Sequence, residues 1–130
     1  MIPSLPLLMV EPVVRAALLE DLGRAGDLTT DAIVPVSAKA KTALVARQPG
    51  VVAGLAAAAT AFRLVDPSID VVVERPDGTV LKPGDRIATI AGPARGMLTA
   101  ERVALNFLGH LSRVASGAAT LVEAVHGHKA

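Results

Sequence analysis

Four hydrogen-bonding side chains recur at helical spacing in the last third of the sequence. Arg102, Asn106, His110 and Arg113 are separated by four, four and three residues, so on a helix they share one face. They supply good hydrogen-bond donors, and the row contains no acid. Such a row suits an anion, above all a carboxylate or a phosphate, because a guanidinium can hold either group through two parallel hydrogen bonds.

The first residue of this row stands in an unfavourable electrostatic position on the helix we expect. Thr99 is a plausible N-cap, which places Arg102 in the first turn, where the helix dipole opposes a cation by a few tenths to about one kcal/mol. Two interpretations follow. In one, Arg102 and the free amides of the helix N-terminus act on the same anion. In the other, which periodicity alone favours, the face is solvated and Arg102 pairs with Glu101 or Asp85.

The elements that carry this row predict an α+β fold. Apolar residues at helical spacing predict a first helix over residues 10–22, ended by Gly23, with Pro12 in its first turn. The stretch from Thr99 to about residue 126 is helical in pattern throughout, with or without a bend near Ser116. We therefore expect helices at both ends of the chain, and the C-terminal one is long.

The middle of the chain, residues 41–92, predicts short strands separated by turns. β-branched runs alternate with turn signals such as Asp77-Gly78, and one helix is expected over residues 55–66. Together the elements predict a small, mainly antiparallel sheet of the barrel-sandwich or hammerhead type with flanking helices. No repeat or linker divides the sequence, so we expect a single domain over residues 1–130.

Composition limits the classes of partner. The chain has 130 residues, a net charge of +1, 2% aromatic residues and no cysteine. Neither nucleic acid nor an anionic membrane is indicated, and disulfides or thiolate metal sites are excluded. The longest uncharged apolar run, residues 51–62, is too short to span a bilayer. The first basic residue, Arg15, follows the N-terminal apolar stretch, which argues against a signal peptide, so we expect a cytoplasmic protein.

The hydrophobic content of 52% is high for a chain that can bury only about 60–70% of its surface alone. Some apolar surface is therefore expected to face another domain or subunit. The terminal segment VEAVHGHKA stops just after a helix stop signal at Gly127. We therefore expect the sequence to be a piece of a longer chain.

Several stretches of the sequence resemble one enzyme family, the quinolinate phosphoribosyltransferases, also called nicotinate-nucleotide pyrophosphorylases (carboxylating). The most specific is LTAERVALNFLGHLS, and the second is the E-D-L-G…G-D-x-T-T segment. The resemblance continues through ARQPGVVAGL, DGTVLKPGDRIATIAGPARGM and VEAVHGHKA. It runs in order from about Val14 to the last residue, and it covers only the N-terminal domain of the family.

The resemblance implies a function that periodicity alone does not. The family converts quinolinate and phosphoribosyl pyrophosphate to nicotinate mononucleotide, carbon dioxide and pyrophosphate with Mg²⁺, in de novo NAD synthesis. Its members are homodimers or higher assemblies in which the N-terminal domain of one subunit closes the catalytic α/β barrel of another. The arginine of the TAER motif, here Arg102, would bind a quinolinate carboxylate in the partner subunit, with Asn106 and His110 as candidate supporting residues.

The catalytic barrel that follows this domain in the family is missing from the sequence. The barrel, with the residues that bind Mg²⁺ and the phosphates, would begin at about "HKA" and continue beyond Ala130. We therefore expect no catalytic residue and no metal ligand in this chain, and no activity from it alone. Two residues depart from the family pattern: Arg113 replaces a glycine, which puts the packing of that helix in question, and His128 replaces a threonine.

Two other functions remain open from the sequence. The DGTVLKPGDRIATIAG hairpin is similar to the half-barrel of biotinyl and lipoyl carriers, but Lys82 stands before a proline and not at a hairpin tip between apolar residues. A pyrophosphorylase-like protein associated with molybdate transport shares the fold. The side chains of His126 and His128 diverge on a helix and would share a face only on a strand, and with no cysteine and few nearby acids the pair does not indicate a metal site.

Overall fold

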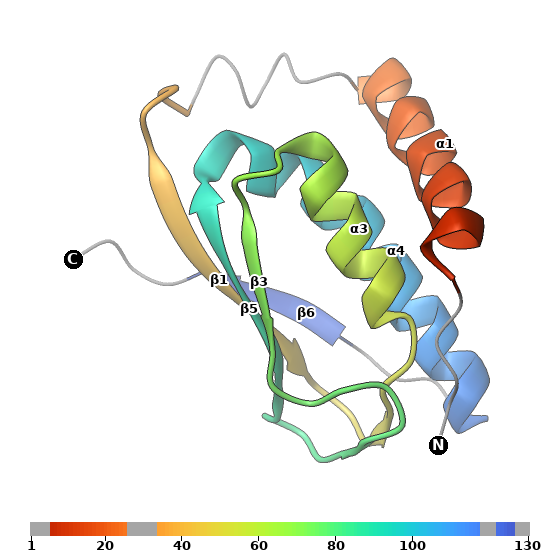
Figure 1. The fold of residues 1–130 in the computed structure, drawn as a ribbon. Helices are drawn as coiled ribbons and strands as arrows, with labels where there is room; N and C mark the ends of the chain where they lie inside the picture. The colour runs from red at the N-terminus through yellow and green to blue at the C-terminus, as the bar shows by residue number, and fades with distance from the viewer. Residues whose placement is uncertain (1–5, 26–33, 118–121, 127–130) are drawn as a thin grey trace.

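The computed structural model describes residues 6–25, 34–117 and 122–126 of the chain. The elements follow one another as α1, β1, β2, α3, β3, β4, β5, α4 and β6 (Figure 1). Their bounds are α1 Leu7–Ala25, β1 Lys39–Ala46, β2 Gly50–Val51, α3 Leu55–Val65, β3 Asp70–Val73, β4 Val80–Leu81, β5 Arg86–Pro93, α4 Ala94–Ser116 and β6 Val122–His126.

The main sheet has four antiparallel strands in the order β3-β5-β1-β6. Its longest ladder joins β1 to β5, from the pair Lys39 and Pro93 to the pair Val45 and Arg86, with an irregularity after Leu44. Strands β2 and β4 form a separate two-stranded ladder. The predicted α+β class, with a small antiparallel sheet and flanking helices, is confirmed.

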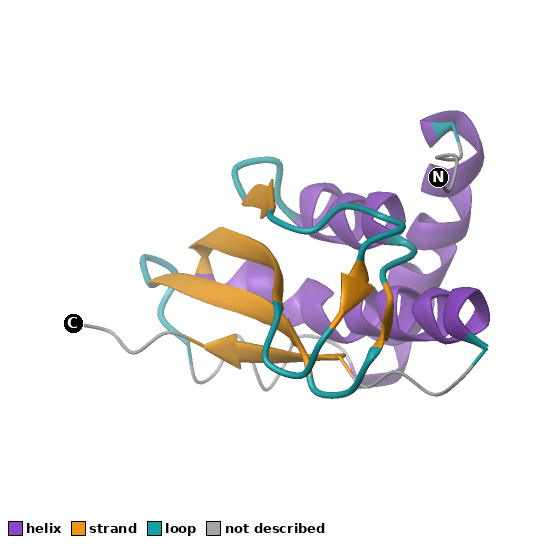
Figure 2. Ribbon diagram, turned by 90° about the horizontal axis from the view of Figure 1, so that it is seen from below, coloured by secondary structure: helices purple, strands orange, loops and turns teal. Residues whose placement is uncertain are grey.

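The helices lie on one side of the sheet, in two layers (Figures 1 and 2). Helix α4 contacts the sheet and α3, and α1 packs outside on α3 and α4. One face of each central strand therefore points into an apolar core. The largest fully buried apolar side chains of that core are Phe62, Leu44, Leu81, Ile87, Ile90, Met97, Leu108, Val14 and Val52.

The predicted bounds of the C-terminal helix, Thr99 to about residue 126, are wrong at both ends. The helix begins earlier, at Ala94, directly after strand β5, and Thr99 is a buried interior residue whose hydroxyl donates to the Arg95 carbonyl. It ends at Ser116, because Gly117 takes the left-handed conformation, with φ 72°, and its N–H bonds the Arg113 carbonyl. Thr99 has a side chain that is typical of an N-cap, but in the structure the helix already begins at Ala94.

The segment after that helix is a strand, not a helical continuation. Residues 122–126 form β6, which pairs with β1 along a register from Ala46 opposite Val122 to Thr42 opposite His126. This pairing is a long-range contact, so the local pattern of the segment did not reveal it. In the part of the chain that the structure describes, no helix is long and apolar enough to cross a membrane.

The N-terminal helix is longer than predicted. It begins at Leu7 and continues through Gly23 to Ala25, so Pro12 lies in its second turn and not its first. Its residues Val10, Val14 and Leu18 follow a four-residue spacing and are buried against the core. The burial of these residues places the C-terminal half of the helix, which contains the E-D-L-G segment, against α4.

The end of α4 is tied to the chain before α3 by two serines, of which Ser112 is fully buried and Ser116 half-buried. The hydroxyl of Ser112 accepts a hydrogen bond from the Ala53 N–H at 3.0 Å and donates to the Ala53 carbonyl at 3.1 Å, and its side chain is fully buried. The Ser116 hydroxyl accepts from the Val51 N–H at 2.7 Å. The final serine of the "HLS" motif is therefore structural.

We predict that Ser112→Ala lowers the free energy of unfolding by about 1–3 kcal/mol, because it leaves the buried N–H and carbonyl of Ala53 without their partner. Urea denaturation followed by circular dichroism measures the change. Ser37→Ala is the matched control: Ser37 is exposed, so its loss is expected to change stability by less than about 0.5 kcal/mol. Equal stability of the two variants would contradict the structural role of Ser112.

Candidate functional site

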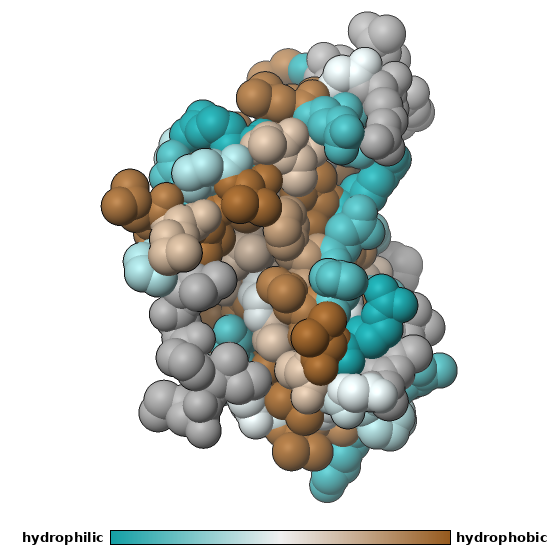
Figure 3. All heavy atoms as spheres, turned by 90° about the vertical axis from the view of Figure 1, so that its right-hand side faces the viewer, coloured by the Kyte–Doolittle hydropathy of each residue, from teal (hydrophilic) through white to brown (hydrophobic). Residues whose placement is uncertain are grey.

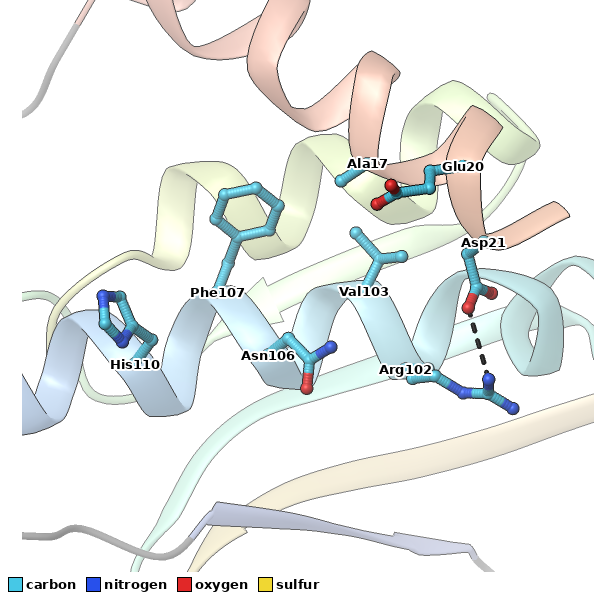
Figure 4. Close-up of a pocket in the computed structure, with 8 residues that line it drawn as sticks. All are labelled: Ala17, Glu20, Asp21, Arg102, Val103, Asn106, Phe107 and His110. Atoms are coloured by element: carbon cyan, nitrogen blue, oxygen red, sulfur yellow. Dashed lines mark hydrogen bonds and ion pairs between the residues drawn. The ribbon is translucent and has the colours of Figure 1, made fainter. Parts of the chain in front are cut away.

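A pocket of about 360 Å³ lies between α1 and α4 (Figure 4). Helix α4 supplies its polar wall and part of an apolar floor, and α1 supplies the opposite wall. The lining residues are Ala17, Glu20, Asp21, Arg102, Val103, Asn106, Phe107 and His110. The TAER motif therefore meets the E-D-L-G part of the second motif at one place, although the two are about 80 residues apart in the chain. The G-D-x-T-T part of that motif lies outside the described residues.

The predicted row on α4 does form one wall. Arg102, Asn106 and His110 are all exposed and line the pocket, while Val103 on the neighbouring face is buried in the core. Arg113 does not line the pocket; it is exposed, and its Nη2 atom lies 3.3 Å from Nδ1 of His110. The structure therefore unites three of the four residues, and Arg113 does not disturb the packing of α4.

Arg102 is paired with a residue that the sequence did not point to. Its Nη1 lies 3.3 Å from Oδ1 of Asp21, at the C-terminal end of α1. The alternative pairings with Glu101 or Asp85 are wrong. The Glu101 carboxylate instead lies 2.7 Å from Nε2 of His126 on β6, and Asp85 lies 3.6 Å from Nε of Arg75. Glu101 faces the sheet because the helix buries that side.

The electrostatic setting of Arg102 differs from the prediction. Because α4 begins at Ala94, Arg102 lies in the interior of the helix, two turns beyond the free amides, where the dipole neither opposes it nor helps it to bind an anion. The side chain of Arg102 is 67% exposed and that of Asp21 is 21% exposed. An exposed pair with a single contact contributes about 0.2–1 kcal/mol to stability.

Sequence reasoning missed the acidic wall of the pocket. Glu20 and Asp21 belong to the E-D-L-G segment, but nothing local in that segment indicates which helix it faces. Only the packing of Val14 and Leu18 into the core turns these acids toward α4. A residue pair separated by 81 positions needs tertiary structure to be found.

Mg²⁺ does not fit this pocket. The guanidinium of Arg102 lies beside Asp21 and would repel a divalent cation from its carboxylate. Across residues 6–25, 34–117 and 122–126, no group of three or more His, Asp or Glu side chains could hold a metal ion. His128 lies outside the described residues. The described residues that line this pocket therefore do not form a binding site for Mg²⁺.

Other charged residues have contacts elsewhere in the fold. Arg47 lies 2.7 Å from Glu123, and this hydrogen bond raises the pKa of Arg47 and lowers the pKa of Glu123, which ties β6 to the end of β1. Arg95 donates from Nε to the Val34 carbonyl at 2.6 Å. Lys82 follows β4 in a turn in which the Lys82 N–H donates to the Asp85 carboxylate. The pocket between α1 and α4 is therefore the strongest candidate site.

Comparison with known proteins assigns the chain to a family. The model of the quinolinate phosphoribosyl transferase N-terminal domain matches residues 27–112. The chain belongs to this family. It is 39% identical over 120 residues to the nicotinate-nucleotide pyrophosphorylase [carboxylating] of Mycobacterium leprae, covering 90% of this chain and 42% of that protein. It is 36% identical over 124 residues to the chloroplastic protein of the same name from Oryza sativa, covering 95% and 33%.

The solved structures agree with this assignment. The crystal structure of NadC from Streptococcus pyogenes matches with a TM-score of 0.83 at 38% identity, covering 88% of this chain and 41% of that one. The nicotinate-nucleotide pyrophosphorylase of Francisella tularensis matches with a TM-score of 0.79 at 27% identity, covering 87% and 40%. The chain thus spans about a third to two fifths of the length of these relatives, and the described fold is that of the quinolinate phosphoribosyltransferase N-terminal domain.

We predict that Arg102→Ala leaves the domain folded and changes its free energy of unfolding by no more than about 1 kcal/mol, because the pair with Asp21 is exposed and has a single contact. Chemical denaturation checks this. Leu108→Ala, at a fully buried position on the same helix, is the contrasting variant and is expected to cost about 2–5 kcal/mol. A loss above about 2 kcal/mol for Arg102→Ala would make Arg102 a structural residue.

Proposed function

We propose that this chain is the substrate-closing and dimerisation domain of a quinolinate phosphoribosyltransferase. The whole enzyme would convert quinolinate and phosphoribosyl pyrophosphate to nicotinate mononucleotide, carbon dioxide and pyrophosphate, a pentosyl transfer that belongs to de novo NAD synthesis. The family match over residues 27–112 and the names of the relatives support this proposal. The isolated chain would be inactive, because the catalytic barrel of the family is not among its 130 residues.

One observation carries the role that we give to Arg102. Its guanidinium is exposed beside the pocket, and within the described residues only one of its nitrogens has a partner, the carboxylate of Asp21. The guanidinium can therefore exchange this single contact for two parallel hydrogen bonds to a carboxylate. In the proposed enzyme, Arg102 binds a carboxylate of quinolinate held in the barrel of the partner subunit.

Asn106 and His110 would support the same ligand. Both line the pocket on the helix face of Arg102, and each can donate a hydrogen bond to a carboxylate or a ring nitrogen. Val103 and Phe107 give the pocket an apolar floor that suits a flat aromatic ring. This chain would bind and orient the substrate and exclude water, while the barrel carries the chemistry. Mg²⁺ belongs to the proposal only through ligands outside this chain.

The outer face of α1 supports the proposed assembly. Leu8, Met9, Val13 and Leu19 are exposed there, at 58–87% of their full accessible surface, although their opposite face is buried in the core. Figure 3, which views the molecule from the α1 side, has apolar residues gathered between polar patches. A helix that is apolar on both sides is expected to be covered on both. We propose that a second subunit covers this face in a homodimer or a larger homo-oligomer.

The competing functions receive less support. A carrier domain needs an exposed lysine at a hairpin tip, whereas Lys82 lies between β4 and β5, which belong to different sheets and do not pair with each other. A molybdate-associated relative would share this domain, so residues of the barrel have to separate the two enzymes. The names of the relatives favour quinolinate chemistry. We place the enzyme in the cytoplasm; recovery in an organelle fraction, the compartment named for the plant relatives, would contradict this.

The first test is the coding sequence that follows the codon of Ala130. An open reading frame that continues into alternating strands and helices of a barrel supports the proposed enzyme. A stop codon contradicts it. The protein encoded by the continuous frame is then assayed for pyrophosphate release that depends on both quinolinate and phosphoribosyl pyrophosphate, and the isolated chain is expected to release none.

In that enzyme, we predict that Arg102→Ala lowers kcat/KM for quinolinate about ten- to a hundredfold, through a higher KM and a lower kcat. The loss corresponds to charge-assisted hydrogen bonds of about 1.5–3 kcal/mol. Arg63→Ala is the matched control, because Arg63 is an exposed arginine on α3 and does not line the pocket. Unchanged kinetics for Arg102→Ala would remove Arg102 from the substrate site.

For the assembly, we predict that the chain associates with itself in a concentration-dependent manner and that Leu8→Glu with Val13→Glu shifts it toward the monomer. Two charges on the apolar face of α1 would have to be buried in the interface. Sedimentation velocity measures the shift. Val36→Glu, at an exposed apolar residue outside α1, is the control. Equal association of the parent and the double variant would exclude α1 from the interface.

A further inference from the structure

The E-D-L-G segment of α1 has no role in the function proposed so far, yet it reaches the same pocket as the TAER motif. Asp21 contacts Arg102 through a single pair of atoms, Oδ1 and Nη1, at 3.3 Å. In Figure 4 the Arg102 side chain extends toward Asp21 and away from His110. The guanidinium therefore lies at the α1 end of the pocket.

The two partners differ in their freedom to move. Asp21 has a short side chain that is 21% exposed, on a helix anchored by Val14 and Leu18, whereas Arg102 has a long side chain that is 67% exposed. If the pair separates, the guanidinium is therefore the part that moves. A single contact between exposed groups is also easily exchanged for another carboxylate.

We propose that Asp21 is the internal counter-ion of Arg102: its carboxylate occupies the guanidinium in the ligand-free domain, and a carboxylate ligand has to replace it. Asp21 therefore lowers the affinity of the pocket for an anion and sets the position from which Arg102 engages its ligand. This inference rests on the proposed function, because it takes Arg102 to be the group that binds a carboxylate. It makes Asp21 a positioning residue that never contacts the reacting atoms.

The sign of the effect separates this role from a structural one. Loss of a residue that merely supports the pocket would weaken ligand binding. Loss of a competing carboxylate strengthens it, because the ligand no longer displaces an internal anion and no longer meets its repulsion. Asp21→Asn keeps the size of the side chain and removes its charge, so it isolates the electrostatic contribution.

The test is a titration of the ¹⁵N-labelled chain with quinolinate, followed by NMR at the Nε–Hε signal of Arg102. The signal is assigned by its disappearance in Arg102→Ala. We expect the dissociation constant of Asp21→Asn to be two- to fivefold lower than that of the parent chain. In the absence of ligand, the same substitution is expected to move the Arg102 signal toward the position of a solvated arginine.

The matched control is Glu11→Gln, which removes a carboxylate from the same helix. Glu11 pairs with Arg15 at 2.6 Å and does not line the pocket. It is expected to leave both the Arg102 signal and the dissociation constant unchanged. If Glu11→Gln tightens binding as much as Asp21→Asn, the effect belongs to the net charge of the chain, and the inference is wrong.

The remaining outcomes distinguish this inference from the proposed function. If quinolinate shifts the Arg102 signal in the parent chain but Asp21→Asn binds equally or more weakly, the counter-ion role is wrong and the role of Arg102 stands. If quinolinate leaves the Arg102 signal unchanged in both proteins, Asp21 does not compete with a carboxylate in this chain and the inference is wrong, whereas the proposed function is decided by the kinetics of Arg102→Ala in the whole enzyme. A lower dissociation constant in Asp21→Asn alone, with a shifted Arg102 signal, supports both.

Discussion

The orientation of α4 about its own axis decides which of its side chains face the pocket. Ala100 and Ala104 are fully buried against the core, and their small side chains let the helix lie close to its neighbours. Ser112 fixes the far end by its two hydrogen bonds to Ala53. Once this face is buried, helical geometry leaves Arg102, Asn106 and His110 facing the pocket.

The close approach of α3 to α4 adds a second constraint. Gly54 precedes α3 in the left-handed conformation, with φ 96°, and a Cβ there would lie 2.8 Å from Cδ1 of Leu111 and 3.2 Å from the Phe107 carbonyl. Glycine satisfies both the backbone conformation and the lack of space. The first turn of α3 thus lies against the end of α4, where Asp77 accepts hydrogen bonds from the Gly54 and Leu55 amides.

The sequence allowed the shared helix face of Arg102, Asn106 and His110 to be predicted, because a four-residue spacing on a helix is a local property. Arg102, Asn106 and His110 therefore needed no tertiary information. The opposite wall did: Asp21 faces Arg102 only because α1 folds back across α4, and no local signal encodes that contact. The helix boundary failed for a related reason. Thr99 has a good N-cap side chain, but the end of strand β5 passes directly into the helix at Ala94.

The corrected boundary changes the charge balance at the pocket. The amide of Ala94 at the true start of α4 donates to the Ala38 carbonyl, two turns away from Arg102, so the helix amides give the pocket no positive potential. The titratable residues that line the pocket are Arg102, Glu20, Asp21 and His110. The guanidinium of Arg102 thus faces a carboxylate of its own chain, that of Asp21, at 3.3 Å. A further anion at this pocket would therefore compete with the Asp21 carboxylate for the guanidinium of Arg102.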